Sequence, residues 1–264
     1  YVGTAQVSAP RVENGRMPTG DSPILVTGGT GTVGRPTVER LRAAGREVRV
    51  LSRQPGEGRI QGDLATGEGL EPALAGVGAV VHLAYGGSDE AEHTRRLAAA
   101  AAAAGVDHLL YISIVGIDGH PFSYYRRKVE AEEAVRAAGV PWTILRATQF
   151  HDFVPRLVGR QRAVVVAPKW AMQPIAVGEV AERLVELVEA GPSGRVADLA
   201  GPEQGALAGF ARVWFTARGR RPLVWELPLP GASGRALRAG AGLGTLPGAG
   251  RQTFAEWARA HAAD

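Results

Sequence analysis

The sequence predicts an α/β protein of the Rossmann type, with a doubly wound parallel sheet and a smaller C-terminal part. Three observations support this prediction. A glycine-rich turn follows the first apolar run, the runs 24–27, 79–83 and 108–114 are apolar almost throughout, and helical stretches separate them. Strands that are apolar on both faces occur in parallel sheets covered by helices on each side, and right-handed crossovers make such a sheet doubly wound.

Residues 23–150 show this alternation most regularly, and we expect them to form one Rossmann domain. Strands are expected at 24–27, 47–52, 59–61, 79–83, 108–114 and 142–147, and helices at 32–44, 68–74, 89–104 and 124–138. Gly45 and Gly139 directly follow two of these helices, as is usual for helix terminators.

The pattern is less regular after residue 150. Strands are expected at 163–167, 196–199 and 223–227, helices at 180–190, 207–217 and 253–261, and loop with some helix at 231–250. We expect residues 151–264 to form a smaller substrate-binding part that is partly interleaved with the Rossmann sheet. Residues 1–22 have no sustained period and several Pro and Gly residues, so we expect an N-terminal extension or an engineered leader outside the fold.

Composition narrows the possible function classes. The chain has 264 residues, of which 45% are hydrophobic and 21% charged, as in ordinary globular proteins. It has no cysteine, which excludes disulfides and thiol catalysis and fits a cytoplasmic location. No run approaches the roughly 20 apolar residues that span a bilayer, so no membrane partner is expected. The net charge is only +4, arginine is dispersed, and no nucleic-acid-binding module is recognisable, so no nucleic-acid partner is expected. The six histidines show no ligand spacing, so no metal is expected.

The turn between the first strand and the first helix reads TGGTGTVG, with glycines at positions 28, 31 and 34. Glycine permits a sharp turn and a close approach of the backbone to a pyrophosphate, which the following helix N-terminus attracts. The predicted cofactor contacts in this turn are Gly28, Thr30, Gly31, Thr32, Val33 and Gly34. A nucleotide-hydrolysing P-loop is excluded because Arg35-Pro36 stands where Lys and Ser or Thr are required.

The end of the second strand indicates which dinucleotide is bound. An acidic residue there would favour NAD, whereas this chain has Ser52-Arg53, and Arg35 follows the glycine turn. A hydroxyl and arginines suit the 2′-phosphate, so we expect NADP as the cofactor. Further expected contacts follow the third and fourth strands: Asp63 and Leu64, then Ala84, Tyr85 and Gly86.

Four stretches carry a family resemblance: TGGTGTVG, YISIVGID, YYRRKVEAEE and PWTILRATQFH. Over roughly residues 24–153, and again at QPIAV (173–177), the chain resembles the NmrA-like type of atypical short-chain dehydrogenase/reductase. The resemblance implies an NADP-binding Rossmann domain with a small substrate domain. It leaves the substrate open, since the group mixes reductases, isomerases and cofactor-sensing regulators.

Tyr124 and Lys128 lie four residues apart on a predicted helix, which places both side chains on one face. A nearby ammonium favours the phenolate, so we expect Lys128 to lower the pKa of Tyr124. As in the short-chain reductases that the chain resembles, Tyr124 would be the general acid, Lys128 would also bind the nicotinamide ribose, and Ser113 would orient a carbonyl oxygen. Tyr124 packing at a helix start, and Ser113 as a plain strand-end residue, are the alternatives.

Thr148 follows the last strand of the Rossmann domain, where it would contact the nicotinamide or instead cap and fill the core. The sequence predicts an NADPH-dependent reductase acting on a carbonyl, quinone or enone of a small organic molecule. A non-catalytic NADP(H) sensor and an NAD(P)-dependent isomerase or epimerase are the alternatives. The sequence does not specify the oligomeric state.

Overall fold

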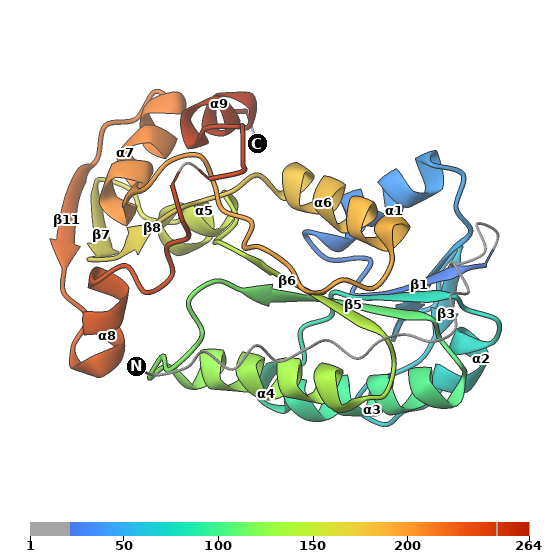
Figure 1. The fold of residues 1–264 in the computed structure, drawn as a ribbon. Helices are drawn as coiled ribbons and strands as arrows, with labels where there is room; N and C mark the ends of the chain where they lie inside the picture. The colour runs from blue at the N-terminus through green and yellow to red at the C-terminus, as the bar shows by residue number, and fades with distance from the viewer. Residues whose placement is uncertain (1–21, 247, 264) are drawn as a thin grey trace.

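The computed structural model describes residues 22–246 and 248–263, so residues 1–21 of the expected leader lie outside the described residues. Its central sheet contains β1 (Ile24–Thr27), β2 (Val48–Ser52), β3 (Arg59–Gln61), β4 (Ala79–His82), β5 (His108–Ile114), β6 (Trp142–Ala147) and β9 (Gly194–Arg195). Neighbouring strands are all parallel, in the order β3-β2-β1-β4-β5-β6-β9 (Figure 1). The first six strands have the Rossmann order, which confirms the predicted fold class.

Helices cover both faces of this sheet (Figure 1). One face carries α1 (Gly34–Ala43) and α6 (Val177–Ala190), and the other carries α2 (Leu70–Leu74), α3 (Glu90–Ala103) and α4 (Ser123–Ala137); the short 3₁₀ helix η1 (Gly87–Asp89) precedes α3. Successive residues of β1 illustrate the packing: Val26 belongs to the core with Leu184 of α6, and Leu25 to the core with Leu97 of α3. Because both faces are buried, the strands are apolar throughout.

A further group of helices and strands lies at one end of the sheet (Figure 1) and packs around a separate hydrophobic core. The elements around it are α5 (Phe153–Val158), β7 (Val164–Pro168), β8 (Ala171–Met172), β10 (Gly205–Ala206), α7 (Leu207–Ala217), β11 (Leu223–Leu227), α8 (Gly231–Arg238) and α9 (Phe254–Ala260). Phe215, Phe254 and Trp257 are among its large buried side chains. We call this part the cap. By contrast, α6 and β9 lie with the Rossmann sheet although they follow residue 150 in the chain.

Several element boundaries differ from those predicted. Helix α1 begins at Gly34 and not at 32, because Thr32 and Val33 still belong to the glycine turn. The strand expected at 196–199 is replaced by β9, which ends at Arg195; Leu199 remains attached through its N–H, which donates to the Arg146 carbonyl at 2.8 Å. Helix α5 was not predicted, since its six residues are too few to show a helical period.

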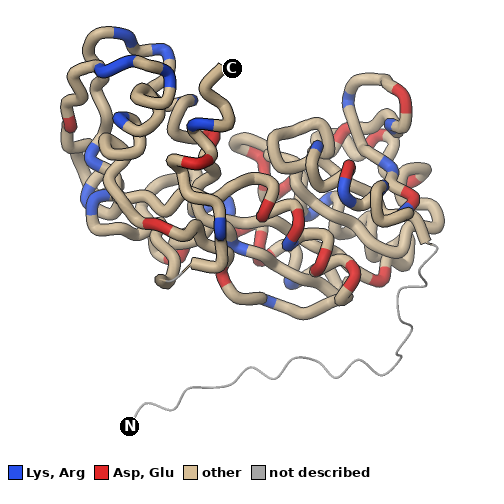
Figure 2. Tube along the Cα trace, turned by 90° about the horizontal axis from the view of Figure 1, so that it is seen from above, with Lys and Arg blue, Asp and Glu red and all other residues tan. Residues whose placement is uncertain are grey.

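Charged residues of both signs are interspersed along the Rossmann part of the trace (Figure 2). Within the described ranges, no helix is long and apolar enough to cross a membrane. The same residues contain no group of three or more His, Cys, Asp or Glu side chains that could hold a metal ion.

Candidate active site

A cavity of about 650 Å³ lies at the carboxyl ends of β1 to β4. This is the edge where Rossmann sheets bind dinucleotides, at the point where the strand order reverses between β1 and β4. We call it the cofactor groove. The predicted contacts that line it are Gly28, Thr30, Gly31, Thr32, Val33, Ser52, Arg53, Asp63, Leu64, Ala84, Tyr85 and Gly86.

Two glycines of the turn are required by its geometry. Gly28 has φ of +69°, and a Cβ there would lie 2.6 Å from the Ala84 backbone nitrogen. A Cβ on Gly34 would lie 2.1 Å from the Gly28 carbonyl oxygen. Gly34 does not line the groove; it lets the start of α1 pack against the turn, which differs from the direct cofactor contact expected for it.

A buried histidine, His82, forms hydrogen bonds at the floor of the groove. His82 Nδ1 lies 2.6 Å from Thr27 Oγ1, and His82 Nε2 lies 3.0 Å from Thr94 Oγ1. Burial, assisted by the positive charges of Lys128 and His93, lowers the pKa of His82 to about 3. The imidazole is therefore neutral, and it joins β1 to β4 at the reversal point of the sheet.

The adenine end of the groove contains one arginine available to a ligand. Arg53 is exposed at the end of β2 and lines the groove, beside Ser52, whose hydroxyl accepts a hydrogen bond from the Gln54 N–H at 3.1 Å. Arg35 does not line the groove; its Nε donates to the Thr30 carbonyl at 2.9 Å and so stabilises the glycine turn. Of the two arginines expected at the 2′-phosphate, only Arg53 lines the groove, so the expected contact stays a prediction for Arg53.

We expect Arg53→Ala to raise the Kd for NADPH about tenfold, because a charge-assisted contact with the 2′-phosphate is lost. The Kd for NADH, which lacks that phosphate, should not change. Fluorescence titration of both dinucleotides measures the two constants. An equal loss for NADPH and NADH would contradict the assignment of Arg53 to the phosphate.

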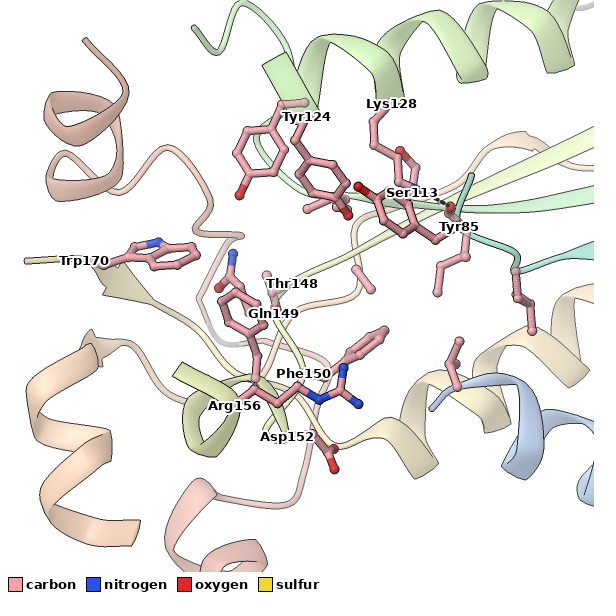
Figure 3. Close-up of a pocket in the computed structure, with 17 residues that line it drawn as sticks. Tyr85, Ser113, Tyr124, Lys128, Thr148, Gln149, Phe150, Asp152, Arg156 and Trp170 are labelled. Carbon is pink, nitrogen blue, oxygen red and sulfur yellow. Dashed lines mark hydrogen bonds between the residues drawn. The ribbon is translucent and has the colours of Figure 1, made fainter. Parts of the chain in front are cut away.

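A second cavity, of about 240 Å³, adjoins the groove (Figure 3). The residues that line both cavities are Val33, Leu83, Tyr85, Tyr124, Phe150 and Arg156. Trp170 and Phe153 contribute aromatic walls from the cap, and Gln149 and Asp152 add polar atoms. Arg156 and Trp170 were not predicted from the sequence, because the cap segments that carry them are short and have no motif. We call this second space the inner cavity.

Tyr124 stands on the wall that the two cavities share (Figure 3). Its ring packs edge-on against Tyr85 with centroids 5.5 Å apart. Burial, followed by the negative charge of Glu90, raises the pKa of Tyr124 above its ordinary value. The lowered pKa expected from Lys128 is therefore wrong, and the phenol is firmly protonated at neutral pH.

Lys128 does not lower the pKa of Tyr124 because its ammonium is paired with a carboxylate. Its Nζ pairs with Glu90 Oε1 at 2.6 Å, and it donates to the Tyr111 hydroxyl at 3.1 Å and to the Ile112 carbonyl at 3.4 Å. Both charged side chains are buried, with 8% of Lys128 and 1% of Glu90 exposed. Lys128 borders the inner cavity, whereas Glu90 and not Lys128 lines the cofactor groove.

Ser113 and Thr148 border the inner cavity, and their hydroxyls differ in hydrogen bonding. The Ser113 hydroxyl oxygen is inaccessible to solvent and makes no hydrogen bond of ordinary length. Burial would raise the pKa of Glu132, but Arg146 and the nearby Ser113 hydroxyl hold it below its usual range. Thr148 Oγ1 accepts from the Gly201 N–H at 3.2 Å. The Ser113 hydroxyl thus has no partner at ordinary hydrogen-bond length among the described residues, whereas Thr148 is engaged with Gly201 and does not line the cofactor groove; the substrate and nicotinamide contacts expected of these residues stay predictions.

The family described as NAD(P)H-binding matches residues 28–190, more than half of the chain. The chain belongs to this family. This NAD(P)H-binding protein is also 36% identical, over 195 residues and 68% of each chain, to the (4-alkanoyl-5-oxo-2,5-dihydrofuran-3-yl)methyl phosphate reductase of Streptomyces griseus. A second relative, the photosystem II assembly factor Ycf39 of Trieres chinensis, is 27% identical over 147 residues, which cover 49% of this chain and 46% of that protein.

Solved structures share its fold. The triphenylmethane reductase of Citrobacter sp. complexed with NADP(H) has a TM-score of 0.74 at 19% identity, covering 91% of this chain and 99% of that one. An NADPH-dependent quinone oxidoreductase from Escherichia coli has a TM-score of 0.71 at 21% identity, covering 90% and 98%. A UDP-N-acetylglucosamine 4-epimerase from Bacillus cereus has a TM-score of 0.68 at 19% identity, covering 91% and 96%. Together with the family match, these likenesses confirm the predicted superfamily and the nicotinamide dinucleotide cofactor.

Proposed function

We propose that this NAD(P)H-binding protein is an NADPH-dependent reductase of small molecules that contain an activated carbon–carbon double bond. The observation that carries the proposal is the inner cavity, which adjoins the cofactor groove and has the Tyr124 phenol on the shared wall. A substrate there would lie between the reactive end of the cofactor and a hydrogen-bond donor. Such an arrangement is what hydride transfer to an unsaturated carbonyl compound requires.

Bound NADPH supplies the hydride, and the protein supplies the surroundings. In this reaction the hydride would add to the carbon β to the carbonyl, and the double-bond electrons would move onto the carbonyl oxygen to give an enolate. The Tyr124 hydroxyl donates a hydrogen bond to that oxygen, where negative charge develops. Water then protonates the α-carbon, which completes the saturated product. Phe150, Phe153 and Trp170 hold the substrate and reduce its contact with solvent.

Two features favour an activated alkene over a simple carbonyl. Tyr124 has a raised pKa, and its expected partner Lys128 is neutralised by Glu90. A phenol that keeps its proton can stabilise an enolate oxygen with a hydrogen bond, so reduction of an activated alkene does not require Tyr124 to ionise. The Streptomyces relative supports the same choice, because the compound in its name has a ring double bond conjugated with a lactone and an alkanoyl group.

A cation at the junction of the cavities suits an anionic substrate. Arg156 of α5 reaches the glycine turn, where its Nη2 donates to Thr32 Oγ1 at 2.6 Å. Among the residues that the structure describes, no carboxylate lies within ion-pair distance of Arg156. Arginine binds phosphate oxygens with parallel N–H donors. The phosphate of the compound reduced by the Streptomyces relative is an anion of the class that Arg156 would hold.

The reaction is tested by following the loss of reduced-nicotinamide absorbance. The substrates are (4-acetyl-5-oxo-2,5-dihydrofuran-3-yl)methyl phosphate, the corresponding alcohol, menadione and 4-nitrobenzaldehyde. We expect the two dihydrofuranones to be reduced faster than the aldehyde. Tight NADPH binding without oxidation by any of the four compounds would contradict the proposal and favour the cofactor-sensor alternative.

We expect Arg156→Gln to raise KM for the phosphate ester about tenfold, because one charge-assisted contact is lost. The KM for the alcohol analogue, which has no phosphate, should stay within about twofold. Steady-state kinetics with both compounds measure the difference. A parallel rise for ester and alcohol would show that Arg156 shapes the cavity without recognising the phosphate.

A further inference from the structure

A buried ion pair between Glu90 and Lys128 lies beside the cofactor groove, and the proposed reaction does not use it. Glu90 begins α3, and Lys128 lies on α4, one turn after Tyr124. Glu90 Oε1 receives hydrogen bonds from both the Lys128 ammonium, at 2.6 Å, and the Tyr111 hydroxyl, at 2.8 Å. Burial and then the charge of Glu90 raise the pKa of Tyr111 well above its ordinary value, so this phenol stays a donor.

Lys128 has no hydrogen left for a ligand. An ammonium carries three donors, and here they are directed to Glu90 Oε1, the Tyr111 hydroxyl and the Ile112 carbonyl. A new contact with the cofactor would require one of these buried bonds to break. The ribose contact expected of Lys128 would therefore compete with the buried hydrogen bonds that Lys128 makes inside the protein.

Glu90 shows the opposite situation. Its Oε2 is buried and has no hydrogen-bond partner, although the residue lines the cofactor groove. An unpartnered carboxylate oxygen in such a place is costly unless a donor reaches it when the ligand binds. Ribose hydroxyls are donors, and a carboxylate accepts hydrogen bonds from them, as the acidic residue of NAD-specific sites does at the adenosine ribose.

The position of Glu90 corresponds to the nicotinamide half of the groove. Arg53 and Asp63 occupy the adenine end, after β2 and β3. Glu90 lies on the other side of the glycine turn, after β4, near enough to Tyr124 for its charge to act on that phenol. Tyr124 in turn belongs to the wall shared with the inner cavity, where the nicotinamide must end for hydride transfer.

We propose that Glu90 binds the nicotinamide ribose hydroxyls through Oε2, and that Lys128 serves as the buried counter-ion that holds Glu90 ionised and in place. Glu90 thereby makes the ribose contact that the Tyr-Lys motif implies for Lys128. Lys128 instead positions the Glu90 carboxylate. The inference rests on cofactor binding and not on the proposed reaction.

The test compares two ligands on the full chain. NADPH contains the nicotinamide ribose, whereas adenosine 2′,5′-bisphosphate contains only the adenine end. We expect Glu90→Gln to raise the Kd for NADPH about 10- to 100-fold, as for loss of a charge-assisted hydrogen bond. The Kd for adenosine 2′,5′-bisphosphate should remain within about twofold. Isothermal titration calorimetry gives both constants without turnover, so the outcome is independent of whether the chain is a reductase.

The result that would overturn the proposal is equally specific. If Lys128 bound the ribose, Glu90→Gln would release it from its ion pair, and NADPH affinity would be kept or would increase. An equal loss for both ligands also counts against the proposal. Should Glu90→Gln fail to fold, Glu90→Asp keeps the charge beside Lys128 but withdraws it by one methylene. The same selective loss of NADPH affinity is then expected, and its absence rejects the proposal.

Discussion

Tyr124→Phe should lower kcat for reduction of the dihydrofuranone substrates about 100- to 1000-fold, the usual effect of deleting a donor to a developing oxyanion. The substitution keeps the ring that packs against Tyr85 and removes only the hydroxyl on the wall of the inner cavity. The Kd for NADPH and the thermal midpoint should therefore change little. Stopped-flow measurement of a single turnover separates the hydride step from product release.

The pH dependence provides a second check on the same residue. An acid acts in its protonated form, which persists below its pKa, and burial with the charge of Glu90 raises the pKa of Tyr124 above 10.0. We therefore expect no fall in single-turnover rate between neutral pH and about pH 9 that could be attributed to Tyr124. A rate that falls through pH 8 in the parent and not in Tyr124→Phe would show a lowered pKa and contradict the structure.

Mild acid should destabilise this protein strongly. Among the described residues, four buried histidines have a lowered pKa, and three of the shifts are large: burial lowers the pKa of His82 to about 3 and those of His108 and His151 to about 4, whereas that of His120 is lowered less. Each of these three stays neutral in the folded state but binds a proton on unfolding below its ordinary pKa of 6.5. Their contribution to stability is complete above that pH and is lost as the pH falls toward the folded values.

The free energy of unfolding should change steeply with pH in this range. One proton bound on unfolding changes the free energy of unfolding by about 1.4 kcal/mol per pH unit, so three give about 4 kcal/mol per unit near pH 5. Summed down to pH 4, the three histidines remove about 9 kcal/mol, so a domain in the lower half of the typical range of about 5–15 kcal/mol should unfold between about pH 5.5 and 4. Urea unfolding at a series of pH values measures the slope, and less than about 1.4 kcal/mol per unit in this range would contradict the prediction.

A single substitution tests the cause of this slope. His108 Nε2 lies 2.9 Å from Thr143 Oγ1, and a glutamine could keep that bond without titrating. His108→Gln should therefore reduce the slope by about one third while it preserves the fold at neutral pH. An unchanged slope would mean that His108 is not among the groups that take up protons.

The fold was largely predictable because its signals are local. The apolar strand β5 is found at the residues predicted, since burial on both sheet faces leaves a run with no polar alternation. Helix α7 also matches its predicted bounds, because its apolar face has a clear helical period. The short elements α5 and β8 were not predicted, since neither is long enough to establish a period.

The lining of the candidate site was predictable where residues belong to local motifs, whereas contacts between distant residues were not. The glycine turn could be recognised because Gly28 and Gly34 leave no room for a Cβ. The electrostatics of Tyr124 were predicted wrongly, because the partner of Lys128 is Glu90, which lies 38 residues before it in the chain and carries no motif. Arg156 was not found for a similar reason: its contact with Thr32 joins residues 124 positions apart. Contacts between such distant residues exist only once the sheet and the cap are assembled.

The wall common to the two cavities implies an order of events. Tyr85, Tyr124 and Phe150 line both spaces, so a dinucleotide in the groove would add to the surface that faces a substrate in the inner cavity. A substrate that arrived first would lack the surface against which it must lie. We therefore expect sequential kinetics of the compulsory-order type, in which the nucleotide enters before the substrate and leaves after the product.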